Sequence, residues 1–152
     1  MLMTSERLEI EAAYARILLP LARLWRAAAD RALSGMGLSA AGGWALVEIG
    51  RLGGDIRQSD LAAKLDVTAA SLVRVIDRLA ANGLVTRRGD PVDGRVSRIG
   101  LTEPGHALAD RIETAFARLR SESLSGLSDD DLETALRVAR HIETRFALAR
   151  GQ

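Results

Sequence analysis

Residues 58–101 read QSDLAAKLDVTAASLVRVIDRLAANGLVTRRGDPVDGRVSRIGL and contain the most clearly patterned part of the chain. Gln58 to Leu65 predicts one short helix, and Thr68 can cap a second helix that runs to Leu79. Asn82-Gly83 ends that helix, because both residues tolerate the left-handed conformation of a helix C-cap. The inward face of the second helix is expected to consist of Leu72, Val75, Ile76 and Leu79. The pattern predicts a helix–turn–helix.

Two short strands are predicted directly after it, at residues 84–88 and 95–101. The polar turn from Gly89 to Gly94 separates them and completes a β-hairpin. Thr102, followed by Glu103 and Pro104, then starts a new helix, since proline is tolerated in a first helical turn.

Long amphipathic helices are predicted on both sides of this centre. Residues 5–33 form the first, in which Pro20 is expected to produce a kink or a break. Ser39 caps a helix over residues 40–52, and Ser128 caps the last helix. The flanking helices carry more apolar surface than the small centre can cover. We therefore predict a homodimer in which two copies bury these faces against each other.

Composition excludes several classes of protein. The chain has 152 residues and no cysteine, which excludes disulfides and thiolate metal sites. Its longest uncharged stretch, Ala32 to Val47, is too short for a membrane span. Acidic residues at positions 6, 9 and 11 argue against a signal peptide. We expect a cytoplasmic, nucleoid-associated protein with no membrane contact.

An enzymatic function has little support in the sequence. His106 and His141 lie on different predicted helices with no partner at the spacing of a metal site or a catalytic triad. No glycine-rich phosphate-binding motif follows a strand. We expect no catalytic residues, no metal and no cofactor.

The net charge of +1 conceals an uneven distribution. Residues 67–100 hold six arginines against three aspartates. Positions 68, 71, 74 and 78 fall on the helix face opposite the apolar one, which leaves them free to meet a partner. In a helix–turn–helix the second helix enters the major groove of DNA, where arginine can bind guanine with two hydrogen bonds. The alternative to DNA contact is an ordinary solvent-exposed helix face.

The hairpin tip, Asp93-Gly94-Arg95, is the second candidate contact. A single arginine on a thin projection suits insertion into a narrow A·T-rich minor groove, where the potential is most negative. Asp93 could hold Arg95 in place. The alternative is a turn selected only for its proline, aspartate and glycine geometry.

The chain resembles the MarR family of winged-helix transcriptional regulators. The motifs that carry the resemblance are in family order and spacing: Gln58 to Ala62, Ser71 to Leu79, Asn82 to Val85, Asp93-x-Arg95, and Leu101 to Gly105. Leu21 to Arg26 and Leu38-Ser39 look like the SlyA-like branch. The resemblance departs from that branch at Gly94, where a second arginine is usual.

The resemblance implies a mainly α fold with a small β-hairpin wing, in which a winged helix–turn–helix core is flanked by N- and C-terminal dimerisation helices. We predict a single domain, 1–152, with dimerisation helices at 5–36 and 103–150 and a DNA-binding lobe at 38–102. The dimer would bind a pseudo-palindromic operator in double-stranded DNA. We expect it to act as a repressor rather than as an activator. The predicted DNA contacts are Thr68, Ala69, Ser71, Arg74, Arg78, Asp93, Arg95 and Arg98.

Family members commonly respond to small anionic aromatic compounds bound between the dimer helices and the DNA-binding lobe. The resemblance therefore implies an effector pocket with Trp25, Arg26 and Trp44, although Trp44 lies one position later than the aromatic of the branch. Trp25 and Trp44 could equally be core or interface aromatics. The remaining alternative is a winged helix that binds only proteins, for which the recognition face should be neutral.

Overall fold

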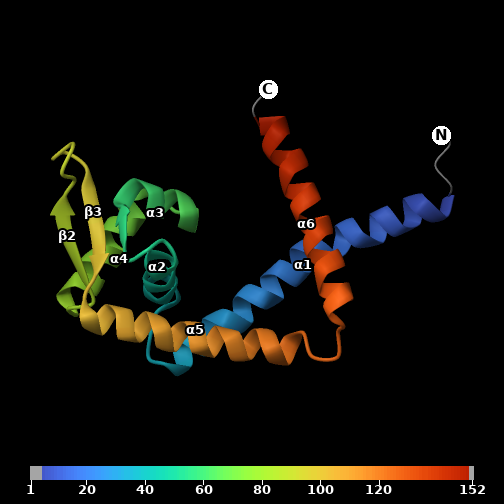
Figure 1. Ribbon diagram of the computed structural model, residues 1–152, viewed down its shortest axis with the longest axis horizontal. Helices are drawn as coiled ribbons and strands as arrows, with labels where there is room; N and C mark the ends of the chain where they lie inside the picture. Colours follow the sequence, from blue (N-terminus) through green and yellow to red (C-terminus); the bar gives the residue numbers. More distant parts are fainter. Residues whose placement is uncertain (1–4, 151–152) are drawn as a thin grey trace. The chain divides into compact units, whose positions relative to one another are not determined.

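The computed structural model describes residues 5–150, and the described part contains six α-helices and one antiparallel sheet of three strands (Figure 1). The first four and the last two residues of the predicted 1–152 domain lie outside this range. The helices are α1 (Ser5–Gly35), α2 (Ala40–Arg51), α3 (Gln58–Leu65), α4 (Ala69–Ala81), α5 (Glu103–Ser123) and α6 (Asp129–Arg150). The predicted mainly α architecture is confirmed.

The sheet has the strand order β1-β3-β2, with β1 at Asp55–Arg57, β2 at Val85–Gly89 and β3 at Ser97–Leu101. The sequence reading missed β1, which is only three residues long and pairs with β3 across the helix–turn–helix. The hairpin was expected to turn over residues 89–94, but Gly89 pairs with Ser97, so the connecting loop is 90–96. We call β2, β3 and this loop the wing.

Three helix starts are capped as predicted. The side-chain oxygens of Ser39, Thr68 and Ser128 accept hydrogen bonds from the amides of Gly42, Ser71 and Asp131, each at 3.1 Å. Such caps satisfy amides that have no partner within the helix, and each is worth about 1 kcal/mol. A kink or a break was expected at Pro20, and the structure shows no break, because α1 continues through it. Proline removes one backbone hydrogen bond there, and the helical turns on either side keep their hydrogen bonds.

The chain divides into two compact units, one ending at Leu119 within α5 and the other beginning at Arg120. In the first unit, α2, α3 and α4 lie against one another and beside the sheet (Figure 1). The largest side chains at its centre have at most 1% of their surface exposed: Leu33, Leu46, Val47, Ile49, Leu61, Leu72, Ile76, Ile99 and Ile112. As predicted, α4 buries Leu72, Ile76 and Leu79, with Val75 half-buried.

Two glycines permit close contacts that hold the lobe together. A Cβ atom at Gly43 of α2 would lie 2.5 Å from Cδ2 of Leu33 on α1. At Gly105, near the start of α5, a Cβ atom would overlap the carbonyl oxygen of Leu84. Thr102 strengthens that second contact, since its hydroxyl donates to the Gly83 carbonyl at 2.7 Å. The α5 start is thereby fixed against the corner between α4 and β2.

Much of α1 and all of α6 remain outside the core. Only Ala29 and Leu33 of α1 are buried, and no residue of α6 is. Large apolar side chains are exposed on α1, including Ile17, Leu21 and Leu24, and on α6, including Leu136 and Phe146. These are residues of the apolar faces for which the sequence predicted a partner copy.

Within residues 5–150 no single helix has the length and apolar character needed to cross a membrane. Taken together, α1 and α2 pass that test of length and composition, but they are bent by 98° at their junction.

Candidate nucleic-acid interface

The outer face of α4 carries the predicted major-groove residues. Thr68, Ala69, Ser71, Arg74 and Arg78 are all exposed. Thr68 caps the helix and also donates its hydroxyl hydrogen to Ser71 Oγ at 2.9 Å, which fixes both side chains at the helix start. A rigid helix start matters here, because the N-terminal residues of a recognition helix are the ones that reach base edges.

The arginines of α4 are available for a ligand. Within residues 5–150, no carboxylate or carbonyl oxygen pairs with Arg74 or Arg78. Arg87 of β2 differs, because it bonds to Asp77 and donates to the Val73 carbonyl at 3.2 Å. The five N–H donors of a guanidinium suit bidentate contacts to guanine or phosphate. The fold therefore distinguishes free arginines on α4 from a paired one beside them.

At the wing, Arg95 projects into solvent with 93% of its side chain exposed. Asp93 Oδ1 accepts hydrogen bonds from the backbone amide of Arg95 at 3.1 Å and from its Nε at 3.4 Å. The prediction that Asp93 holds Arg95 is thus confirmed. The terminal Nη groups of Arg95 have no partner among the described residues.

Arg98 has different surroundings from the other predicted contacts. Only 24% of its side chain is exposed, and it donates to Asp55 Oδ1 and Asp90 Oδ2, each at 3.2 Å. Arg98 lies directly between Arg57 of β1 and Arg88 of β2 in the strand register. Like charges directly opposite each other destabilise a sheet, so this row of arginines requires carboxylates.

Two aspartates supply that negative charge. Asp55 pairs with Arg88 and Arg98, and Asp90 pairs with Arg98 and, at 3.4 Å, with Arg57. Sequence reasoning missed both roles and treated Asp90 only as a turn residue. No local signal marks them, because the Asp55–Arg98 hydrogen bond joins residues 43 positions apart.

Asp90 is also tied to the loop of the wing. Its Oδ1 accepts the amides of Val92 at 2.9 Å and Asp93 at 3.2 Å. These backbone hydrogen bonds, supported by the Arg98 and Arg57 guanidinium groups, lower the pKa of the Asp90 carboxyl to about 2. The side chain is only 3% exposed, so a charged group stands at the base of the wing.

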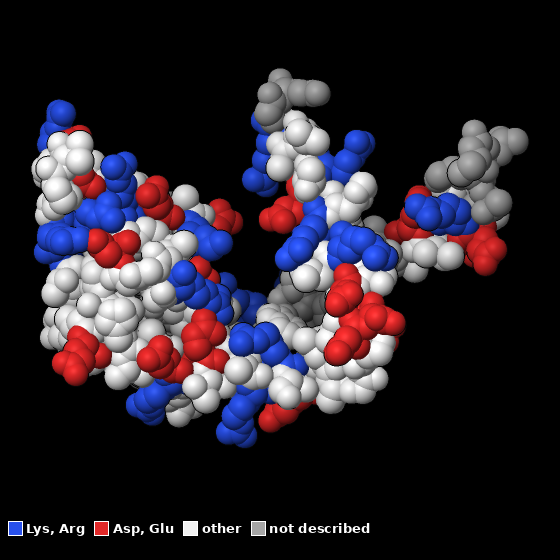
Figure 2. Space-filling view, viewed as in Figure 1, with Lys and Arg blue, Asp and Glu red and all other residues white. Residues whose placement is uncertain are grey.

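A groove joins the wing to the start of α4. It has a volume of about 320 Å³ and is lined by Gln58, Ser59, Ala69, Arg95, Val96 and Ser97. The predicted residues Ala69 and Arg95, which are far apart in sequence, thus border one surface. Figure 2 shows basic side chains gathered over β2 and β3 and at the tip of the hairpin.

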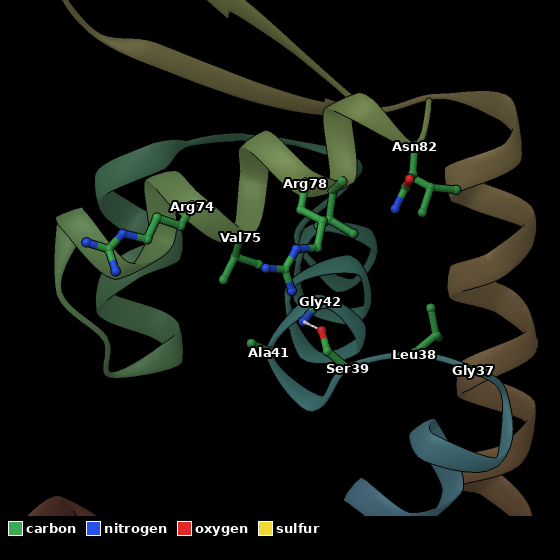
Figure 3. Close-up of a pocket in the computed structure, with 11 residues that line it drawn as sticks. Gly37, Leu38, Ser39, Ala41, Gly42, Arg74, Val75, Arg78 and Asn82 are labelled. Atoms are coloured by element: carbon green, nitrogen blue, oxygen red, sulfur yellow. Dashed lines mark hydrogen bonds between the residues drawn. The ribbon is translucent and has the colours of Figure 1, made fainter.

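A second cavity, of about 390 Å³, lies between α4 and the start of α2. Figure 3 shows Arg78 reaching from α4 toward Ser39, Ala41 and Gly42, whereas Arg74 extends away from them. The two arginines of α4 therefore point to different places on the same face of the lobe.

The predicted effector residues are only partly brought together. A third cavity, of about 310 Å³, is lined by Arg26 of α1, Trp44 of α2, and residues of α3 and α4 that include Leu65, Ser71 and Val75. Trp25 is not among its lining residues and has 37% of its surface exposed. Trp44 also packs against Phe116 of α5, with ring centroids 5.0 Å apart, so it serves both the core and the cavity.

Comparison with known proteins places this interface in a family. Residues 36–96, which span α2 to the loop of the wing, match the MarR family. A solved structure described as the transcriptional regulator PA3341 is 30% identical to the chain and covers 88% of it. The chain covers 98% of that protein, with a TM-score of 0.80. The chain belongs to the MarR family. It is a DNA-binding transcriptional regulator with a winged helix–turn–helix, and the family is not one of enzymes.

Two further solved structures are similar to the chain. A mutant MarR from Escherichia coli, complexed with operator DNA, is 25% identical with a TM-score of 0.71, over 84% of this chain and 91% of that one. CouR from Rhodococcus jostii RHA1, bound to p-coumaroyl-CoA, is also 25% identical with a TM-score of 0.71, over 83% and 88% of the two chains.

Proposed function

We propose that this MarR-family regulator is a homodimeric repressor of the SlyA-like branch, that it binds a pseudo-palindromic operator, and that a small aromatic anion releases it. The observation that carries the DNA part is a set of exposed arginines: Arg74 and Arg78 on α4, which have no partner among the described residues, and Arg95, which projects from the wing. Helix α4 would enter the major groove and the wing the adjacent minor groove.

The proposed contacts divide by chemistry. Arg74, with Ser71 and Thr68 beside it, would read base edges, and Arg95 would enter the minor groove held by Asp93. Ala69 at the start of α4 and Arg78 near α2 would contact the sugar–phosphate backbone of the DNA. Arg98, paired with Asp55 and Asp90, would support the wing rather than reach a base. The E. coli relative bound to operator DNA supports this mode.

The dimer is proposed from the exposed apolar faces of α1 and α6, which no part of the described chain buries. Large apolar side chains exposed along a helix indicate an interaction site, and a second copy of the same chain supplies a matching one. In this arrangement 5–36 and 103–150 would form the dimer and 38–102 the DNA-binding lobe. Repression is proposed because occupying a promoter requires only the DNA contacts that this surface offers.

The effector part rests on the cavity lined by Arg26 and Trp44, in which the guanidinium lies over the indole ring. The same cavity borders Ser71 and Val75 of α4, so a bound molecule would touch the recognition helix itself. The relative that binds p-coumaroyl-CoA supports an aromatic acid derivative as ligand class.

Fluorescence anisotropy with a salt series tests the DNA part. The probe is a duplex of about 30 base pairs recovered by the chain from a random library, long enough for two half-sites one turn apart. We expect tight binding as a dimer, with the logarithm of the association constant falling linearly with the logarithm of salt concentration. A flat salt response, or equal affinity for an unselected duplex, would instead indicate a winged helix that binds proteins.

A further inference from the structure

The loop of the wing is held closed from within, and Asp90 is the residue at its centre. The Asp90 amide donates to the Val96 carbonyl at 2.8 Å, and the Val96 amide donates to the Asp93 carbonyl at 2.9 Å. Inside this ring, Asp90 Oδ1 accepts the amides of Val92 and Asp93. Asp93 in turn holds Arg95 through its amide and its Nε. A continuous series of hydrogen bonds therefore leads from Asp90 to the projecting arginine.

The two carboxylate oxygens of Asp90 have separate tasks. Oδ1 faces the loop, while Oδ2 faces Arg98 at 3.2 Å and Arg57 at 3.4 Å. Arg57 is also the N-cap residue of α3, and its side chain makes no cap hydrogen bond. Asp90 thus ties the loop to the sheet and to the first residue before a helix of the helix–turn–helix.

From this geometry we propose that Asp90 is the positioning residue for Arg95, fixing where the wing arginine meets the minor groove. The inference rests on the proposed DNA contact of Arg95 and adds the residue that aims it. A guanidinium on an ordered loop loses less conformational freedom on binding than one on a mobile loop, so its contact is stronger and more selective. Asp90 acts through Asp93 and itself touches no DNA.

Asp55 provides a matched control. Removing Asp55 changes the charge by the same amount and releases arginines of the same row, Arg88 and Arg98. However, Asp55 makes no hydrogen bond to the loop in the described structure. A change of charge alone should therefore affect Asp55→Ala and Asp90→Ala alike, whereas a loss of positioning should affect only Asp90→Ala.

The test uses the full chain and two duplexes, the selected one and a version whose A·T-rich flanks are replaced by G·C pairs. We expect Asp90→Ala and Arg95→Ala each to weaken binding to the first duplex about tenfold, and the double variant to bind within about twofold of Arg95→Ala. Asp55→Ala should keep the wild-type preference for A·T flanks. If the double variant instead loses affinity by the product of the two single losses, the two residues act independently and the proposal is overturned.

A measurement without DNA separates this inference from the proposed function. Amide order parameters at Val92, Asp93 and Arg95 should fall from about 0.85 to below about 0.6 in Asp90→Ala and remain high in Asp55→Ala. Unchanged loop order would overturn the positioning role even if DNA binding is confirmed. If the loop loosens but Arg95→Ala binds like wild type, the proposed wing contact is wrong, and the inference that depends on it fails too.

Two more variants cover the case in which Asp90→Ala does not fold. Asp90→Asn keeps an oxygen for the loop amides and removes the charge, so it should retain the A·T preference. Asp90→Glu keeps the charge but moves the carboxylate by one methylene away from those amides, so it should lose the preference. If Asp90→Glu retains the A·T preference and Asp90→Asn loses it, Asp90 only balances the charge of the arginines.

Discussion

The guanidinium of Arg26 lies over the indole of Trp44, with its Cζ 4.3 Å from the ring centroid. Asp30 joins the pair, because its Oδ1 accepts hydrogen bonds from Arg26 Nε at 3.3 Å and from Trp44 Nε1 at 2.8 Å. This arrangement leaves the Nη groups of Arg26 without a partner among the described residues, at the wall of a cavity that α4 also lines. The cation and the aromatic ring that an aromatic anion needs are thus held in place together.

We expect Arg26→Ala to weaken binding of 4-hydroxycinnamate by about 1.5–3 kcal/mol, the range for hydrogen bonds to charged groups. Calorimetric titration measures this loss of binding free energy. Trp44→Phe should weaken binding less than Arg26→Ala, because an aromatic ring remains. Trp25→Phe is the control, since Trp25 does not line the cavity. An equal loss in Trp25→Phe would place the ligand elsewhere.

Arg74→Ala should relax base preference rather than abolish binding. A bidentate contact to a base is worth about 1–3 kcal/mol of discrimination against the wrong base. Competition between the selected duplex and single-base variants measures that discrimination. Arg74→Lys should keep affinity for phosphate but lose the forked contact. Arg111→Ala, an exposed arginine on α5, removes the same charge away from α4 and should leave the preference intact.

Local signals in the sequence were sufficient for most of this fold. Ser39, Thr68 and Ser128 mark helix starts because a cap is formed within three residues, and the inward face of α4 follows from helical periodicity alone. Strand β1 could not be predicted in the same way. Its three residues gain their structure from β3, whose partner residues lie more than forty positions later.

The candidate site shows the same division. Arg74 and Arg95 were predictable, because exposure on a helix face or at a hairpin tip follows from local geometry. Arg98 looked equivalent to them, and only the folded sheet shows that Asp55 and Asp90 enclose it. Likewise, Trp44 reaches Arg26 through the packing of α2 against α1, which the Gly43–Leu33 contact permits and which no sequence motif specified.

Leu24→Glu should convert the dimer into a monomer. Leu24 lies on α1 with 68% of its surface exposed in the single chain, so in a dimer its burial would place the glutamate charge in an apolar interface. Sedimentation velocity measures the oligomeric state. The control is Leu52→Glu, in the turn after α2, which should stay dimeric. A Leu24→Glu variant that remains a dimer would exclude this face of α1 from the interface.

Gly43→Ala should destabilise the lobe by about 1 kcal/mol, since overpacking costs about 1–3 kcal/mol and the helix gains about 1 kcal/mol from alanine. The added methyl group would meet Leu33, which is fully buried and has little room to move. Urea unfolding measures the change. Gly50→Ala in the same helix should instead stabilise, because its Cβ would make only an ordinary contact at 3.6 Å with Ala109.

Acid should remove the contribution of Asp90 to stability. Its folded pKa of about 2 lies below the value of about 3.9 in the unfolded chain, so the unfolded state binds more protons between these values. The contribution is complete above about pH 4 and is lost as the pH falls through about 2. Urea midpoints of the wild type and Asp90→Asn should therefore differ at pH 5 and converge toward pH 2, because protonated Asp90 resembles the neutral variant. Parallel curves across this range would show that the charge of Asp90 does not stabilise the wing.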